Sequence, residues 1–264
     1  MFINLDSVTE TLINETTKLA VQCHALVKGK HTQKTQTFVK ACIAYVHITI
    51  PTIESSQKQC RLFQQAAQVA LMNGLIGETD SLIRAALQQL DENFDPKIEG
   101  LLFIVEQVLH MLGFLVIVPS NPEEGFFQIV EGIVQLIKLH DWSADASSEL
   151  QVRIYAGCVS YLASQVQDKL PYQVDYVNSN DQIFIGNDEF KQEANQLMDD
   201  LFAQVLEVIT KLNEEKVLHS LTLFMICLKT ANLLIVSGNA ADKKVGNFAN
   251  KMFKMSDGYM TEYN

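Results

Sequence analysis

The sequence predicts an all-α protein, specifically an α-solenoid of antiparallel helical hairpins of the HEAT-like kind. Apolar residues recur at spacings of three and four through almost the whole chain, which is the period of an amphipathic helix. The five prolines and most glycines fall at or near expected helix ends. Several expected helices are apolar on two faces, as a hairpin must be when it is covered by the hairpins on both sides.

The apolar pattern divides into about ten helices with mostly short connections, which favour antiparallel neighbours. We expect helices near residues 8–28, 34–50, 54–73, 78–92, 96–118, 122–140, 147–169, 188–213, 215–236 and 241–254. No strict sequence period is visible, although paired helices of this length fit a repeat of roughly 40–47 residues. We therefore expect one solenoid over residues 1–264, ending in a terminal amphipathic helix at 241–255.

Capping residues mark the expected helix starts. Asn121 is placed as an N-cap, with Pro122 at the first helical position and Glu124 able to complete a capping box. Similar signals precede three other helices: Asp95-Pro96, Ser7 with Glu10, and Asn187 followed by Asp188 and Glu189.

Composition limits the classes of function. The chain has 264 residues, of which 48% are hydrophobic, so it is long enough and apolar enough to bury a large core. Its first residues do not resemble a secretory signal, and its five scattered cysteines suit a reducing, cytosolic compartment. Glu106, Gln107 and His110 interrupt the most apolar stretch, 101–118, which favours a buried core helix over a membrane span.

Charge is concentrated in one segment. The net charge is −11, and residues 141–200 carry eleven acidic and three basic side chains. This acidity argues against nucleic acid as a partner. The segment is either a solvated acidic surface or a patch that meets a basic partner.

No motif predicts catalysis, a cofactor or a metal. Cys23, His24, Cys42, His47 and Cys60 lack the spacing of a zinc site. The interval 178–189 has the outline of a calcium loop, but its sixth position holds Ile183 where glycine is needed for the turn. No nucleophile motif surrounds Cys158 or Cys227, so a thiol- or metal-dependent enzyme is only an alternative to be tested.

Two segments are candidate contact surfaces. The stretch 170–186 is a long irregular connection, and such connections are usually functional or packed on the surface. The terminal helix has an apolar stripe opposite four lysines, which indicates either a docked capping helix or a contact with a membrane surface or partner helix. We expect exposed partner contacts at six residues: Phe126, Trp142, Tyr172, Asp175, Asn180 and Asp181.

Four ordered stretches carry a resemblance to a known family. They are the run from Phe38 to Pro51, Val116 to Gly125, Val152 to Tyr155, and Val177 to Gly186. In order and spacing they resemble the carboxy-terminal solenoid of the vacuolar protein sorting-associated protein 35-like family, the scaffold subunit of the retriever complex. The resemblance covers roughly residues 35–215, and residues after about 215 match poorly.

The resemblance implies a scaffold without enzymatic activity. It implies that this region holds a small subunit with an inactive phosphoesterase-like fold, and that an arrestin-like subunit binds a part of the solenoid not included here. It also implies a cytoplasmic protein that is peripheral on endosomes and associates with their membrane only indirectly. A coiled-coil companion complex is a further implied partner. A generic helical-repeat adaptor for another assembly is the alternative, because a fold does not dictate a function.

Overall fold

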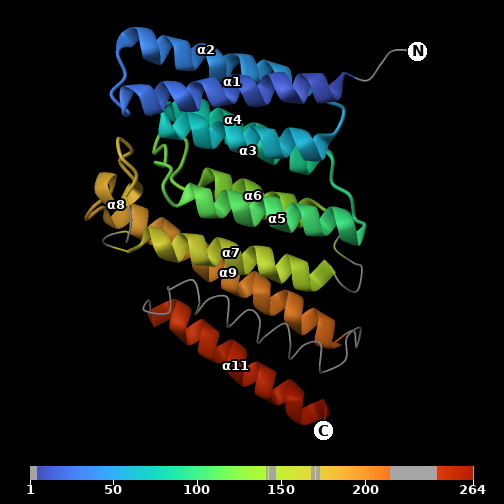
Figure 1. Cartoon of the computed structure of the whole chain (residues 1–264). Coiled ribbons are helices and arrows are strands. Elements are labelled where there is room, and N and C mark those ends of the chain that lie inside the picture. Colours follow the sequence, from blue (N-terminus) through green and yellow to red (C-terminus); the bar gives the residue numbers. More distant parts are fainter. Residues whose placement is uncertain are drawn as a thin grey trace. The chain divides into compact units, whose positions relative to one another are not determined.

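A computed structural model describes residues 5–140, 142, 147–167, 170, 173–214 and 243–263. Within these ranges every regular element is a helix (Figure 1), so the predicted all-α class is confirmed. The chain divides into two compact units. Unit 1 comprises Met1–Phe94, Ile117–Pro119 and Pro171–Ser179, and unit 2 comprises Asp95–Val116, Ser120–Leu170 and Asn180–Asn264. A single continuous solenoid stays a prediction, and the expected helix 215–236 lies outside the described residues.

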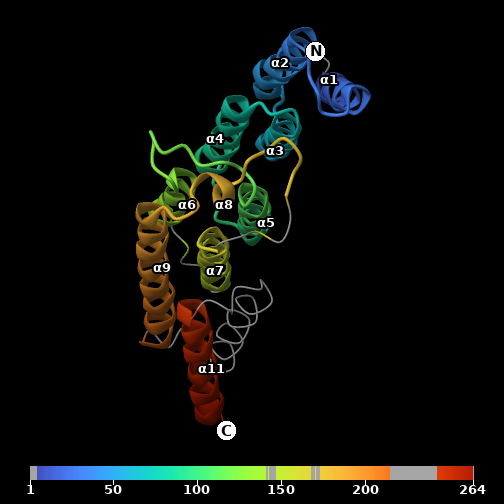
Figure 2. The same cartoon turned by 90° about the vertical axis from the view of Figure 1, so that its left-hand side faces the viewer.

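Unit 1 is built from two helical hairpins. Its helices are α1 (Asp6–Val27), α2 (Gln33–Thr49), α3 (Ser56–Met72) and α4 (Ile76–Glu92), with a short 3-10 turn, η1 (Ile50–Thr52), between the hairpins. Helix α1 packs on α2, α3 packs on α4, and both α1 and α2 contact α3. Figure 2 shows each pair nearly end-on. Apolar side chains of these helices, including Val39 and Phe63, form the buried core of this unit.

Local chemistry explains the helix ends of unit 1. Thr32 and Thr35 form a reciprocal capping box at the start of α2. After α3, Gly74 adopts φ +72°, and the Leu75 N–H donates to the Ala70 carbonyl at 3.0 Å. This is a Schellman-type end, for which a glycine is favoured.

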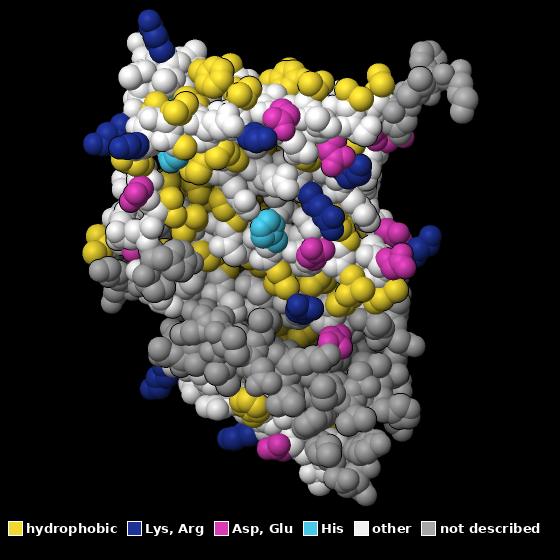
Figure 3. Space-filling model, in the orientation of Figure 1, with side chains coloured by type: hydrophobic (Ala, Val, Ile, Leu, Met, Phe, Trp, Pro, Cys, Tyr) yellow, Lys and Arg dark blue, Asp and Glu magenta, His cyan; other side chains and the backbone are white. Residues whose placement is uncertain are grey.

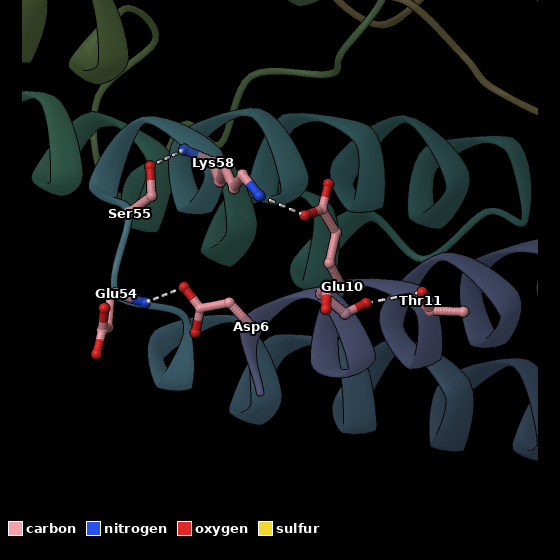
Figure 4. Close-up of polar contacts among 7 residues, drawn as sticks. Asp6, Glu10, Thr11, Glu54, Ser55 and Lys58 are labelled. Atoms are coloured by element: carbon pink, nitrogen blue, oxygen red, sulfur yellow. Dashed lines mark hydrogen bonds and ion pairs between the residues drawn. The ribbon is translucent and has the colours of Figure 1, made fainter. Parts of the chain in front are cut away.

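The capping box predicted at Ser7 and Glu10 is wrong. Helix α1 begins at Asp6, without a side-chain cap. Two acids near the start of α1 reach α3 and the turn before it (Figure 4): Asp6 Oδ2 accepts from the Glu54 N–H at 3.2 Å, and Glu10 Oε2 pairs with Lys58 Nζ at 2.7 Å. Glu10 therefore pairs with Lys58 of α3 instead of forming a local capping box with Ser7.

Unit 2 is centred on α7. Its described helices are α5 (Ile98–Leu115), α6 (Gln128–Leu139), α7 (Ser147–Gln165), α8 (Asn180–Ile183), α9 (Asp188–Glu214) and α11 (Lys243–Tyr263). Helix α7 packs against α5 and α9 and is buried along most of its length. Gly157 allows the close approach of α5, because a Cβ there would lie 2.4 Å from Leu109 Cδ2.

Two predicted helix starts in unit 2 are wrong, for the same physical reason. Asn121 Oδ1 accepts from the Glu123 N–H at 3.1 Å, and Asp95 Oδ1 accepts from the Lys97 N–H at 3.0 Å. Such side-chain turns compete with helix initiation. Helix α6 therefore begins at Gln128 instead of residue 122, and α5 begins at Ile98. Asn187, by contrast, does cap α9, since its Oδ1 accepts from the Phe190 N–H at 3.0 Å.

The terminal helix is docked by its apolar stripe. Val245, Phe248 and Met252 are buried, and Phe248 stacks on Phe202 of α9 with ring centroids 4.1 Å apart. Lys244 Nζ pairs with Asp199 Oδ2 at 2.7 Å beside this contact. The helix is therefore docked by its apolar stripe and continues beyond the predicted end to Tyr263, whereas a role in capping a solenoid stays a prediction.

Helix α5 is the one described helix that is long and apolar enough to cross a membrane by length and composition alone, with a mean hydropathy of 1.6. Half of it is buried against its neighbours. Glu106 and His110 lie on its exposed face, whereas Val105 and Val108 face the interior. This sidedness is typical of a core helix, as predicted.

Candidate functional site

The structure describes the long connection between α7 and α9 continuously from residue 173, and this connection is divided between the two units. Residues 173–179 are part of unit 1, and residues 180–187 are part of unit 2. The second part begins with the single-turn helix α8. We describe the two parts separately, because different contacts hold each one.

A buried asparagine fixes the start of the second part. The Asn180 side chain accepts from the Ser120 N–H at 2.8 Å and donates to Ser120 Oγ at 2.9 Å and Gln165 Oε1 at 2.7 Å. Gln165 Nε2 in turn donates to the Val116 carbonyl at 3.4 Å. This network ties α8, the end of α7 and the segment after α5 together. Buried amides stabilise a fold only when their hydrogen bonds are satisfied, as these are.

An aromatic cluster holds the segment that follows α8. Phe184 stacks on Phe190 of α9, with ring centroids 4.9 Å apart. Phe126 meets both rings edge-on, at 5.1 Å from Phe184 and 5.2 Å from Phe190. The Phe127 ring also contacts Phe190, with ring centroids 5.0 Å apart. Phe190 is 2% exposed, so it is the buried centre of the cluster.

Two isoleucines on either side of Phe184 point outward. Ile183 is 46% exposed and Ile185 is 74% exposed, although the ring between them is packed. Two exposed acids, Asp188 and Glu189, follow at the start of α9. The segment 183–189 therefore presents apolar side chains beside negative charge, on a base made rigid by the aromatic cluster.

The first part of the connection is held by a tyrosine. Tyr176 has a φ of 65°, and its hydroxyl donates to the Lys28 carbonyl at the end of α1, at 3.2 Å. Its ring covers Gly29, and the side chain remains 58% exposed. Val177 and Ser179 are buried next to it. These contacts hold residues 173–179, which we name the strap, against the turn between α1 and α2.

The structure places the predicted contact residues in different settings. Asp175 is exposed, Phe126 is half-buried in the aromatic cluster, and Asp181 is half-buried with Oδ2 accepting from the Leu170 N–H at 3.0 Å. Exposure was wrongly expected for Asn180 and for Trp142, which is 6% exposed and donates from Nε1 to the Ile137 carbonyl at 2.9 Å. Tyr172 lies outside the described residues. Partner binding by these six residues stays a prediction.

Sequence reasoning missed Ile183 and Ile185 as surface residues. The available signal was the run Ile183-Phe184-Ile185 inside an irregular connection, where an extended chain alternates its side chains between two sides. That run predicts that either the ring or the two isoleucines face outward. Only the aromatic cluster in the fold decides that the ring is the buried one.

Cys42, Cys60 and Cys158 are buried core residues, whereas Cys23 is half-buried. Burial raises the pKa of the Cys60 and Cys158 thiols to about 12 and also raises the pKa of Cys42. A thiol must ionise to act as a nucleophile or metal ligand, so these three side chains are poorly suited to either role. Among the described residues, no three His, Cys, Asp or Glu side chains are arranged to hold a metal ion. Cys227 lies outside them.

The helices of each unit pack on one another, and within the described residues they define an all-α protein. The chain belongs to the family of the VPS35L C-terminal domain, whose family model matches residues 1–261. The extent predicted from sequence, residues 35–215, was therefore too short at both ends.

Several curated relatives carry the name VPS35 endosomal protein-sorting factor-like. The Mus musculus relative is 30% identical over 97% of this chain and 27% of its own length. The Dictyostelium discoideum relative is 32% identical over 92% of this chain and 25% of its own length. The Drosophila melanogaster relative is 34% identical over 79% of this chain and 21% of its own length. The chain thus spans about a quarter of the length of the relatives it matches.

Proposed function

We propose that this chain is a non-catalytic α-solenoid scaffold of a retriever-type complex, which recycles membrane cargo from endosomes. In this role it holds a small subunit with a phosphoesterase-like fold, on the cytoplasmic side of endosomes. The family match over residues 1–261 carries the proposal, together with relatives named as endosomal protein-sorting factors. An arrestin-like subunit and a coiled-coil companion complex would bind other parts of the assembly.

The surface of unit 2 supports a role in protein binding. Ile183 and Ile185 are exposed, yet the aromatic cluster below them is packed and the hydrogen bonds of the Asn180 side chain are satisfied. Preorganised apolar residues lose little entropy when a partner covers them. The acids Asp188 and Glu189 favour a partner surface with an apolar pocket and a basic rim.

Co-expression with the small phosphoesterase-fold subunit tests the proposal. We expect co-elution at a one-to-one ratio in size-exclusion chromatography with light scattering. The double variant Ile183→Asp with Ile185→Asp should weaken this complex at least tenfold, because it places two charges in an apolar contact. Leu139→Asp is the matched control, since Leu139 is 76% exposed on α6 of the same unit and should tolerate the charge without loss of binding.

Circular dichroism of each variant checks that the helices remain folded. A folded chain that elutes alone would contradict the proposal and favour a generic adaptor of another assembly. If the double isoleucine variant still binds the small subunit, the scaffold role stands, but segment 183–189 is not part of the interface. Asp175→Lys then tests the exposed acid of unit 1 in the same assay.

A further inference from the structure

The turn between α1 and α2 is a basic region in an acidic chain. The net charge of the chain is −11, yet residues 16–53 carry five lysines and no acidic residue. Three of these lysines, Lys28, Lys30 and Lys34, lie at the turn and are exposed. Figure 3 shows basic side chains projecting from this end of the hairpin, at the upper left. Positive charge is therefore concentrated at one end of the first hairpin of unit 1, where it can attract an anionic surface.

The three lysines of the turn form no ion pair with any residue that the structure describes. The other two lysines of the run, Lys18 and Lys40, each pair with a glutamate at 3.4 Å. Asp175, the one acid of the strap, pairs with none of the turn lysines. His31 in the same turn meets no hydrogen-bond partner among these residues at either ring nitrogen, so no carboxylate binds it there. The positive charge of the turn is therefore available to an external anion.

Apolar and aromatic side chains flank these lysines. Leu26, two residues before Lys28, is 84% exposed. Tyr176 of the strap lies over Gly29 and is 58% exposed. Tyrosine rings are enriched where water meets lipid, and exposed leucines next to basic residues can enter the boundary between headgroups and acyl chains. An acidic protein segment would need only the charges, so this combination fits a lipid surface better.

We propose that the α1–α2 turn contacts an anionic lipid surface directly, with its three lysines against the headgroups and Leu26 at the acyl boundary. The inference rests on the proposed function, which places the chain on the cytoplasmic side of endosomes, because cytoplasmic leaflets carry anionic lipids. This direct contact adds to the indirect membrane association that the family resemblance implies. Three lysines bind weakly on their own, so the contact orients a scaffold that other parts of its assembly hold at the membrane.

Vesicle flotation tests the contact, using this chain and vesicles of phosphatidylcholine and phosphatidylserine in a three-to-one ratio. We expect binding that weakens as salt is added and is absent with pure phosphatidylcholine, because salt screens exposed charges. The triple variant Lys28→Gln, Lys30→Gln and Lys34→Gln should lower the partition coefficient at least tenfold. Leu26→Ser should lower it about threefold, because less apolar surface enters the lipid. Leu139→Ser, at a 76% exposed position of α6, should leave it unchanged.

The matched control removes three lysines from unit 2. Lys243, Lys251 and Lys254 of α11 are exposed and form no ion pair with any described residue, so their triple glutamine variant changes the net charge by the same amount. The apolar stripe of α11 is buried and cannot enter lipid. This variant should bind vesicles nearly as well as the unmodified chain. Loss of binding here, with binding retained in the turn variant, would overturn the proposal and place the membrane contact on α11.

Three further results would overturn the proposal: no salt-sensitive binding to the anionic vesicles, an equal loss in both triple lysine variants, or binding to polyglutamate, but not to vesicles, that the turn variant abolishes. The last result would assign the turn to an acidic protein segment. Circular dichroism checks that each variant is folded.

Co-elution with the small phosphoesterase-fold subunit is measured on the same proteins, and the turn variant should retain it. A chain that co-elutes with this subunit but does not bind the vesicles contradicts only the present inference. A chain that binds the vesicles but not the subunit contradicts only the proposed function. The two failures are therefore distinguishable.

Discussion

The two parts of the connection between α7 and α9 are anchored in opposite ways. Residues 180–184 are fixed by a buried amide with three hydrogen bonds and by a ring in an aromatic cluster. Residues 173–179 depend on Tyr176, which is 58% exposed, has a positive φ and makes one hydrogen bond to the Lys28 carbonyl. We infer that the second part opens only with its unit, whereas the first can be released locally.

The largest expected effect lies at the centre of the aromatic cluster. Phe190→Ala removes a ring that contacts Phe126, Phe127 and Phe184. We expect it to lower the free energy of unfolding by about 3–5 kcal/mol, because it leaves a cavity in a packed site. Urea denaturation followed by circular dichroism measures this. Ile185→Ala is the control and should change stability by less than about 0.5 kcal/mol, since Ile185 is 74% exposed.

The buried amide should come next. Asn180→Ala removes the partners of the Ser120 N–H and of Gln165 Oε1 at a position where the asparagine is 1% exposed. Leaving these groups unpaired should cost about 2–3 kcal/mol in the same denaturation assay. Asn178→Ala, two residues earlier at an exposed position, should be nearly neutral. If the two substitutions had equal effects, the conclusion that residues 180–184 are held more firmly than residues 173–179 would be wrong.

These two sites also show where sequence reasoning ends. The helical period predicted where most of the helices lie, because it depends on local spacing alone. It could not predict that Asn180 meets Ser120, sixty residues earlier, or that Tyr176 reaches Lys28, which is 148 residues away. Such pairs depend on how the elements pack, and packing also turned Asn180 from an expected contact residue into a buried anchor.

A smaller effect tests the strap of unit 1. Gly29 and Gly74 both have a φ of +72°, but only Gly29 lies against a side chain, since a Cβ there would be 2.2 Å from Tyr176 Cε2. Each alanine substitution should cost about 1 kcal/mol from backbone strain. Gly29→Ala should cost about 1 kcal/mol more, because the tyrosine ring must move and its hydrogen bond is lost.

Tyr176→Ala provides the double-mutant cycle for this strap. In that background the two glycine substitutions should become equivalent, because no ring then lies against position 29. Hydrogen exchange of residues 173–179 should accelerate in Gly29→Ala and not in Gly74→Ala. Unchanged exchange in Gly29→Ala would show that the tyrosine does not hold this stretch.

The smallest effect concerns a carboxylate at the edge of the aromatic cluster. Burial raises the pKa of Glu193, and the nearby charges of Glu131 and Glu189 add to this, whereas the backbone N–H groups of Phe126 and Phe127 partly oppose it. An acid whose pKa is raised by folding stabilises the fold fully below its unfolded pKa, and this stabilisation is lost as the pH rises through the folded pKa. At neutral pH the ionised Glu193 therefore works slightly against the anchored part of the connection.

Glu193→Gln should accordingly raise the free energy of unfolding at pH 7 by a few tenths of a kcal/mol, a small figure because the side chain is only partly buried and solvent screens it. The gain should shrink as the pH falls toward 4.5, the ordinary value for this group, because the wild-type carboxyl then becomes neutral as well. Denaturation midpoints between pH 4 and pH 8 measure the difference. Glu131→Gln should give part of the same gain by removing one neighbouring charge, and a gain that did not depend on pH would mean that the glutamine acts through packing and not through charge.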